Sequence, residues 1–520
     1  MILIHLFALI FIIGMLYGLY RMNALSKTSG KNILLLLFLS AFLLRCICAW
    51  FYVGFTNDIN CFYNWANHAY ENGISGFYSS GVFSDYPPGY IYLLYVIGAI
   101  FSIFKIPYLS GACLLLLKLP AILCDMAAGI LLYKTCKKIC TNNQAVLFTA
   151  FYLFNPAVFI NSSLWGQVDS VFTLTVILMC LFLTNKKMVP AYIAFGIGIL
   201  LKPQTLVFAP VLLLGILDHV ILNHFSWRNF FHNLFAGLCV IFCMILVCMP
   251  FGINLVIAQY TSTLASYPYV AVNAFNFWGF FGLNWIPQDQ KLLFFSYEHW
   301  GTIIIVLIVL FSVVLFIKTK KSANRYFITA AFLIISMFLF SVRMHERYLF
   351  PAIILLLFAY IKRPSKSILV SYIGFSVLLF YNTAYILFFY DTQNYNRKAP
   401  LFIVVSACMV ICGIFFYRTL YLNNVKQTAA GDSFGEFYLL PSKLFTNIDK
   451  NSFEPKFMPR PSEQTLPFIK ADILIILVIT VIYSAFALFD LGDTKAPQSD
   501  YLMKQGESVT LYMEKEKPAA

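Results

Sequence analysis

Long apolar runs separated by short polar segments dominate this 520-residue chain. A helix needs about 17–25 mostly apolar residues to cross a bilayer. Because the runs lack the period-two alternation of barrel strands, we predict helices, roughly 13–15 of them transmembrane. The predicted spans are residues 1–20, 33–53, 88–104, 111–133, 144–160, 171–184, 189–201, 204–222, 233–250, 300–317, 326–342, 349–361, 367–388, 401–421 and 472–490.

Composition agrees with this pattern. The chain is 61% hydrophobic and 11% charged, whereas a soluble protein carries roughly 25% charged residues. The sequence therefore predicts an all-α polytopic integral membrane protein in contact with membrane lipids. Its net charge of +14 lies mostly in short loops between spans, which argues against a nucleic-acid partner. Residues 1–20 lack a basic start and a small-residue cleavage site, so we interpret them as a span.

The basic loops predict the orientation, because cytoplasmic loops are enriched in Lys and Arg. We expect cytoplasmic loops at residues 21–31, 134–138, 186–187, 318–325 and 362–366, and outer loops at 54–87, 161–170, 252–299, 343–348 and 391–400. Residues 88–133 contain two apolar segments yet must cross an odd number of times. Either one segment is re-entrant or interfacial, or the predicted boundaries are wrong.

The predicted domains are a transmembrane core (1–421), a polar cytoplasmic linker (422–470), a last transmembrane helix (471–490) and an outer tail (491–520). The 13 cysteines are scattered, mostly in apolar runs, and show no metal-ligand spacing. We interpret them as packing residues.

The first outer loop carries two carboxylates of interest. Asp58 follows directly on a span, before an aromatic segment that suits an interfacial helix. It is a candidate general base, or alternatively the N-cap of a helix over 59–68. Asp85 precedes Pro87 and Pro88, and it is a candidate binding residue or a cap or turn residue.

Two further stretches follow along the chain. In the first, Trp165, Gln167 and Asp169 surround a glycine, and their side chains suit stacking on a sugar and hydrogen bonds to its hydroxyls. Asp169 could instead start the next helix. In the second, Lys202 lies between two short apolar segments. It is costly there unless it meets an anion or a cavity, or unless it snorkels to the surface.

Two outer loops complete the set. Residues 267–279 interleave aromatic and amide side chains, which suits either carbohydrate binding or an interfacial aromatic belt. Arg343, His345 and Arg347 lie close together between two spans. Arg binds phosphate by paired hydrogen bonds, so these residues indicate a phosphate site, with a solvated turn containing ion pairs as the alternative.

A single reaction accounts for these candidate residues. Transfer of a sugar from a lipid phosphate needs a base for the acceptor hydroxyl and positive charge for the departing phosphate. The chain shows no glycine-rich phosphate loop beside a strand, so a lipid-linked donor fits better than a nucleotide-linked one. The alternative is a transporter or flippase of lipid-linked sugars, which would place its ionisable residues near the bilayer midplane. A structural scaffold would leave the polar outer clusters unexplained.

The motifs also resemble a known family. In order, these are Asp58, Ser84–Tyr90, Trp165–Ser170, Lys202–Gln204 and His345–Tyr348. They resemble GT-C fold glycosyltransferases over roughly residues 35–420. In particular they are similar to bacterial relatives of the second mannosyltransferase of GPI-anchor synthesis, and comparable to glucosyltransferases of N-glycan precursor assembly.

The resemblance implies inverting transfer of a hexose, mannose favoured, from a polyprenyl-phosphate donor to a glycan, lipid or protein acceptor. It implies that Asp58 acts as the base, and that Asp85 and Asp169 lie near donor and acceptor. His345 and Arg347 would lie near the donor phosphate. It places the reaction on the extracytoplasmic face, here of a bacterial plasma membrane. Many family members have two adjacent acidic residues where this chain has Asp58 alone, so we predict no metal and no cofactor. The tail, 491–520, resembles the start of a carbohydrate-binding β-sandwich but is too short to build one.

Overall fold

The computed structural model describes residues 2–22, 31–79, 81, 83–222, 225–320, 322–390, 392, 395–396 and 399–422. The longer helices are α1 (Ile2–Met22), α2 (Lys31–Phe51), α3 (Thr56–Gly76), α4 (Pro88–Phe104), α5 (Gly111–Cys136), α6 (Asn142–Leu153), α8 (Asp169–Thr184), α9 (Met188–Leu201), α10 (Ala209–Leu217), α11 (Trp227–Cys248), α12 (Ile253–Ala265), α14 (Tyr297–Lys318), α15 (Arg325–Phe340), α16 (Phe350–Lys362), α17 (Lys366–Phe389) and α18 (Pro400–Leu420). Shorter elements are α7 (Pro156–Phe159), α13 (Phe277–Phe280), β1 (Ala271–Val272), β2 (Lys291–Leu292), β3 (Phe295–Ser296) and β4 (Met344–His345).

The helical composition confirms the predicted all-α polytopic membrane fold. Among the described residues, seven helices are long and apolar enough to cross a membrane, and a bent pair formed by α6 and Pro156–Trp165 would be an eighth. Six further apolar helices have 10–17 residues. Proline at the first turn starts α4 and α18, where its missing N–H costs nothing. The predicted linker, last helix and tail lie outside the described residues, apart from residue 422.

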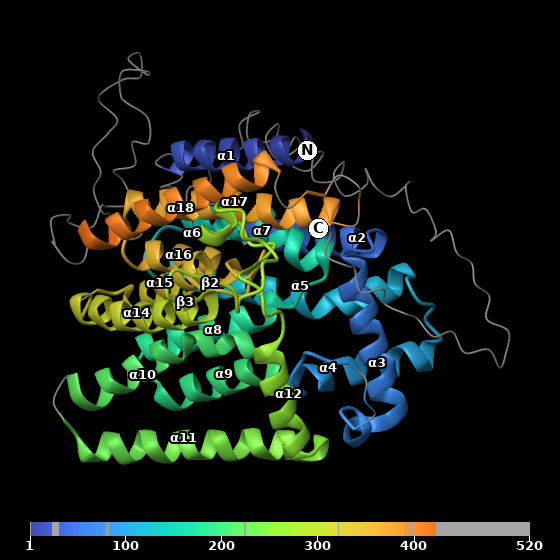
Figure 1. The fold of residues 1–520 in the computed structure, drawn as a ribbon. Helices are drawn as coiled ribbons and strands as arrows, with labels where there is room; N and C mark the ends of the chain where they lie inside the picture. Colours follow the sequence, from blue (N-terminus) through green and yellow to red (C-terminus); the bar gives the residue numbers. More distant parts are fainter. Residues whose placement is uncertain are drawn as a thin grey trace, which may run out of the picture.

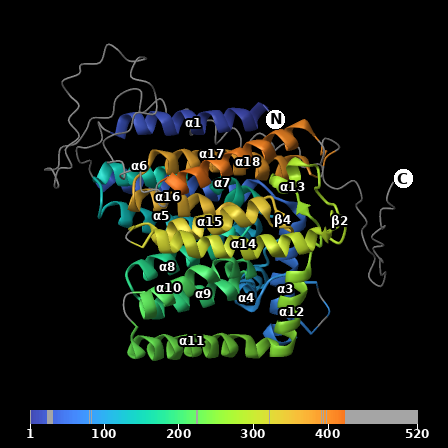
Figure 2. The same cartoon turned by 60° about the vertical axis from the view of Figure 1, so that its left-hand side comes forward.

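The helices form a layered bundle. In Figure 1, α1, α18, α14, α8, α9 and α11 run in a similar direction, with α1 and α11 in the outermost layers. Helices α3 and α12 cross this direction steeply and lie toward one end of the bundle (Figures 1 and 2). The aromatic segment after Asp58 belongs to the helix α3, as the sequence predicted.

The ambiguous segment 88–133 forms two helices, α4 and most of α5. The Tyr92 hydroxyl of α4 donates to the Val247 carbonyl near the C-terminal end of α11 (3.0 Å). After α4, the ring of Tyr108 lies 4.6 Å from that of Tyr63 in α3. Helix α4 and the loop after it thus contact elements at the end of the bundle where α3 and α12 lie (Figure 1). We infer that α5 makes the single crossing.

Two of the basic loops, 318–325 and 362–366, meet at the opposite end, where Arg363 Nη1 donates to Ser322 Oγ (3.5 Å). Lys320 Nζ donates to the Leu222 carbonyl (2.8 Å), and Arg325 pairs with Asp218 (2.8 Å). These contacts join the end of α10 to the loop between α14 and α15. The end of the bundle that carries α3, α4 and α12 is thus separated from this basic end by the length of the helices.

Candidate active site

Asp58 lies in the first turn of α3 and points toward the segment that follows α7. The N-cap of α3 is Phe55, which uses no side chain, so the alternative that Asp58 caps a helix over 59–68 is wrong. Instead Asp58 Oδ2 accepts hydrogen bonds from Trp165 Nε1 (2.6 Å) and from Gln167 Nε2. Oδ1 accepts no hydrogen bond from the described part of the chain, so one carboxylate oxygen is fixed and the other is available.

The backbone around Trp165 brings these donors to Asp58. Residues Ile160–Trp165 form a π-helical turn, a geometry often found at functional sites. Gly166 follows with a φ of +89°, and a Cβ there would lie 2.9 Å from Ile59 Cδ1. At Gly54, with a φ of +97°, a Cβ would lie 2.5 Å from the Trp165 carbonyl oxygen. Only glycine permits this close approach of the two segments.

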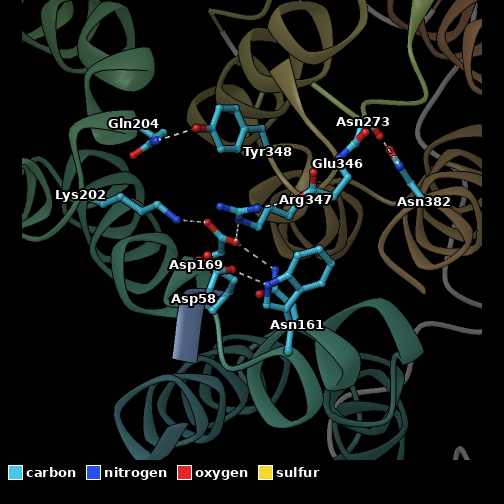
Figure 3. Close-up of polar contacts among 12 residues, drawn as sticks. Asp58, Asn161, Asp169, Lys202, Gln204, Asn273, Glu346, Arg347, Tyr348 and Asn382 are labelled. Carbon is cyan, nitrogen blue, oxygen red and sulfur yellow. Dashed lines mark hydrogen bonds and ion pairs between the residues drawn. The ribbon is translucent and has the colours of Figure 1, made fainter. Parts of the chain in front are cut away.

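Asp169 is the centre of a buried polar cluster (Figure 3). Its Oδ1 lies 2.5 Å from Lys202 Nζ, and its Oδ2 accepts from Asn161 Nδ2 (3.1 Å). Arg347 Nε lies 3.8 Å from Oδ2. Asp169 is the first residue of α8, so it does start this helix, but the N-cap is Val168 and no side chain caps the helix. Lys202 is 4% exposed, which rules out the snorkelling alternative.

The segment between α15 and α16 is folded inward rather than solvated. Glu346 and His345 are 2% and 7% exposed. Arg347 pairs with Glu346, and its guanidinium lies 5.6 Å from the ring centre of Trp165. Burial and the nearby cations hold the pKa of His345 well below its ordinary value of 6.5, so the imidazole is neutral. The alternative of a solvated turn is therefore wrong.

These groups surround one cavity of about 230 Å³. The predicted site residues that line it are Asp58, Asp85, Trp165, Gln167, Lys202, His345 and Arg347. Asp169, which is 1% exposed, lies behind the wall and holds its two cations. Arg343 is not among the lining residues. Its guanidinium donates to Gln288 Oε1 (2.7 Å) and pairs with Glu298 (3.2 Å).

Side chains of α12 donate hydrogen bonds to the backbone at Asp85, which lines the cavity. Thr263 Oγ1 donates to the Asp85 carbonyl (3.4 Å), and Gln259 Nε2 donates to the preceding carbonyl of Ser84. Burial raises the pKa of the Asp85 carboxyl from its ordinary value of 3.8 to about 6, and the neighbouring Asp58 carboxylate contributes to the rise. Asp85 and Asp58 thus share the cavity.

Some lining residues were not among the predicted site residues. Glu346, Trp285 and Tyr390 all face the cavity. The parallel pairing of β1 with β4 brings the loop before α14 alongside the His345 segment. Pairing of two-residue strands more than 70 residues apart has no sequence signature. Glu346 could have been found, because a glutamate beside Arg347 in an apolar environment needs a charged partner.

Residues 85–253, about a third of the chain, match the family of dolichyl-phosphate-mannose-protein mannosyltransferases. The match confirms the GT-C resemblance. It supports a membrane glycosyltransferase that uses a polyprenyl-phosphate-linked sugar. The matched region includes Asp85, Trp165, Gln167, Asp169 and Lys202, while Asp58 and Arg347 lie outside it. No curated protein matches the chain.

For such a glycosyltransferase, the cavity offers the two groups that the reaction needs. A carboxylate with a free oxygen, the buried Lys202 and the partly buried Arg347 line the same space. Among the described residues, no group of three or more His, Cys, Asp or Glu side chains is arranged to hold a metal ion. The expectation that no metal and no cofactor takes part stays a prediction.

Proposed function

We propose that this protein transfers a hexose, with mannose favoured, from a polyprenyl-phosphate donor to an acceptor hydroxyl with inversion at the anomeric carbon. One observation carries the proposal. Asp58 lines the same cavity as Lys202 and Arg347, so a base and the cations for a leaving phosphate are available to one substrate pair. The acceptor belongs to a glycan, a lipid or a protein.

In the proposed reaction, Asp58 Oδ1 takes the proton of the acceptor hydroxyl as that oxygen attacks the anomeric carbon. The bond between this carbon and the phosphate oxygen breaks, and the electron pair leaves with the phosphate. Lys202 and Arg347 stabilise the added negative charge because they are fixed before the reaction begins. Trp165 and Gln167 hold the carboxylate by its other oxygen, so that Oδ1 faces the acceptor.

We further propose that the cavity opens to the extracytoplasmic face of the membrane. Two of the basic loops, 318–325 and 362–366, lie at the other end of the bundle, and such loops face the cytoplasm. A cysteine at exposed Thr261 in α12 should therefore react with a membrane-impermeant maleimide added outside intact cells, and a cysteine at exposed Lys137 should react only after permeabilisation. The reverse pattern would contradict the orientation.

The activity test is incubation of the purified protein with mannosyl- and glucosyl-phosphate polyprenols and a panel of acceptors. The proposal predicts a new glycosidic bond whose anomeric configuration is opposite to that of the donor. Retention of configuration would contradict direct displacement. A transporter would move the donor across a vesicle membrane without forming a product, which separates the two classes of protein.

A further inference from the structure

Asn273 offers a hydrogen-bond donor to the cavity from a part of the wall that the reaction above does not use. The residue is 5% exposed and lines the cavity. Its Oδ1 accepts from Trp285 Nε1 (2.8 Å), from Asn284 Nδ2 (3.3 Å) and from the Tyr395 hydroxyl. Its backbone carbonyl accepts from Asn382 Nδ2 (2.7 Å), as Figure 3 shows.

These contacts fix which way the amide points. An indole N–H can only donate, so the atom facing Trp285 must be the oxygen of Asn273. The Nδ2 group therefore points away from these partners. Within the described part of the chain no group accepts a hydrogen bond from Asn273 Nδ2, and this atom is not sealed from the cavity. Asn273 thus presents an N–H donor to whatever occupies the cavity.

Aromatic rings accompany this donor. Trp285, Tyr267 and Tyr390 also line the cavity. Tyr267, Asn273 and Trp285 have φ values of +53°, +59° and +61°, which cost free energy in residues other than glycine. Backbone strain of this kind is retained where the surrounding structure requires a particular side-chain placement.

The donor lies apart from the cations. In Figure 3, Asn273 lies on the far side of Glu346 from Lys202. The cavity therefore has a cationic part at Lys202 and Arg347 and an amide-aromatic part at Asn273, Trp285 and Tyr390. The amide-aromatic part suits a neutral ligand with hydroxyl acceptors and apolar C–H faces, since aromatic rings pack against such faces. A sugar unit has both features.

A peptide fits this wall less well. An extended peptide binds most readily by adding to a free strand edge. Here β1 pairs with β4 on one side, and Ala271 bridges to Asn284 on the other. The backbone of this wall is already paired, so recognition falls to side chains.

We propose that Asn273, Trp285 and Tyr390 form an acceptor subsite that binds a carbohydrate, so that the acceptor hydroxyl belongs to a sugar rather than to a protein. This inference rests on the proposed transfer reaction and names its acceptor. Asn273 donates to a hydroxyl of the acceptor sugar, and the rings pack against its faces.

The test compares alkyl glycosides with Ser- and Thr-containing peptides as acceptors for mannosyl- and glucosyl-phosphate polyprenol. The informative variant is Asn273→Asp, which keeps an oxygen for Trp285 and removes the N–H donor. The KM for the alkyl glycoside should rise ~5-fold or more. The KM for the donor and its slow hydrolysis by water should change less than ~2-fold. The exposed Asn72→Asp, which makes the same chemical change on α3, should leave both unchanged.

Tyr390, which lines the cavity in the same part as Asn273, provides a second variant. Tyr390→Leu should also raise the KM for the glycoside selectively. Transfer to peptides in preference to glycosides would overturn the inference about the acceptor. An unchanged glycoside KM in both variants would also overturn it. Either result would leave the proposed transfer reaction intact. A wild-type protein that neither transfers nor hydrolyses either donor would overturn the proposed function and the subsite with it.

Discussion

Asp169 bridges the two cations of the cavity, with Oδ1 2.5 Å from Lys202 Nζ and Oδ2 3.8 Å from Arg347 Nε. The carboxylate is buried behind the wall, whereas both cations line the cavity. It therefore balances their charge and fixes their position without contacting the substrate itself. This arrangement makes Asp169 a positioning residue.

The first prediction concerns this ion pair. Asp169→Asn should lower the free energy of unfolding by about 3 kcal/mol, because it leaves Lys202 buried without its counter-charge. The double variant Asp169→Asn with Lys202→Met should recover most of that stability, since no unpaired charge remains. Thermal unfolding in detergent measures both. A double variant no more stable than the Asp169→Asn single variant would contradict the pairing.

The second prediction separates the two arginines of the same loop. Arg347→Ala should reduce kcat/KM for the lipid-phosphate donor by ~10²-fold or more, because it removes a preorganised cation from the leaving phosphate. Arg343→Ala is the matched control. Its partners Gln288 and Glu298 lie outside the cavity lining, and a partly exposed ion pair contributes at most ~1 kcal/mol to stability.

Steady-state kinetics with varied donor measures both arginine variants. Equal losses from the two would contradict the assignment of the phosphate to Arg347. An unchanged donor kcat/KM in Arg347→Ala would remove this residue from the phosphate site altogether.

The third prediction follows from Asp85. Its pKa rises from 3.8 in an ordinary environment to about 6 in the fold. Between these values the folded protein holds a proton that the unfolded chain has released, so stability falls as the pH rises through this window. Asp85→Asn should remove this loss. The difference in Tm between variant and wild type should therefore grow in favour of the variant from pH 4 to pH 6. A difference independent of pH would contradict the raised pKa.

Much of the fold could be predicted from the sequence, because apolar runs in this chain mark helices directly. The predicted span 88–104 matches α4, and 171–184 ends with α8. The crossing of α5 could not be derived, since α4 is as apolar as a span. The position of α4 depends on contacts that this helix and the loop after it make with α11 and α3. The pattern of apolar residues along the sequence does not show such contacts.

Site residues were predictable where a charged side chain in an apolar stretch requires a partner of opposite charge. A lysine such as Lys202 between apolar segments needs an anion, and Asp169 supplies it. The separate positions of Arg343 and Arg347 were not predictable, because the course of the short segment that contains β4 decides which side chain turns inward. The charged pair Arg45 and Asp125, 3.6 Å apart and fully buried between α2 and α5, was not predicted either, because each residue lies alone within an apolar run.

Single-turnover transfer by Asp58→Asn tests the central claim most directly. The change keeps the size of the side chain and an oxygen for the Trp165 bond, but it removes the base. Sugar transfer from polyprenyl-phosphate mannose or glucose should fall by about 10²–10⁴-fold, while the donor KM and the thermal unfolding of the protein stay close to those of wild type. Transfer by Asp58→Asn at a rate comparable to wild type would contradict the proposal that Asp58 accepts the proton of the acceptor hydroxyl.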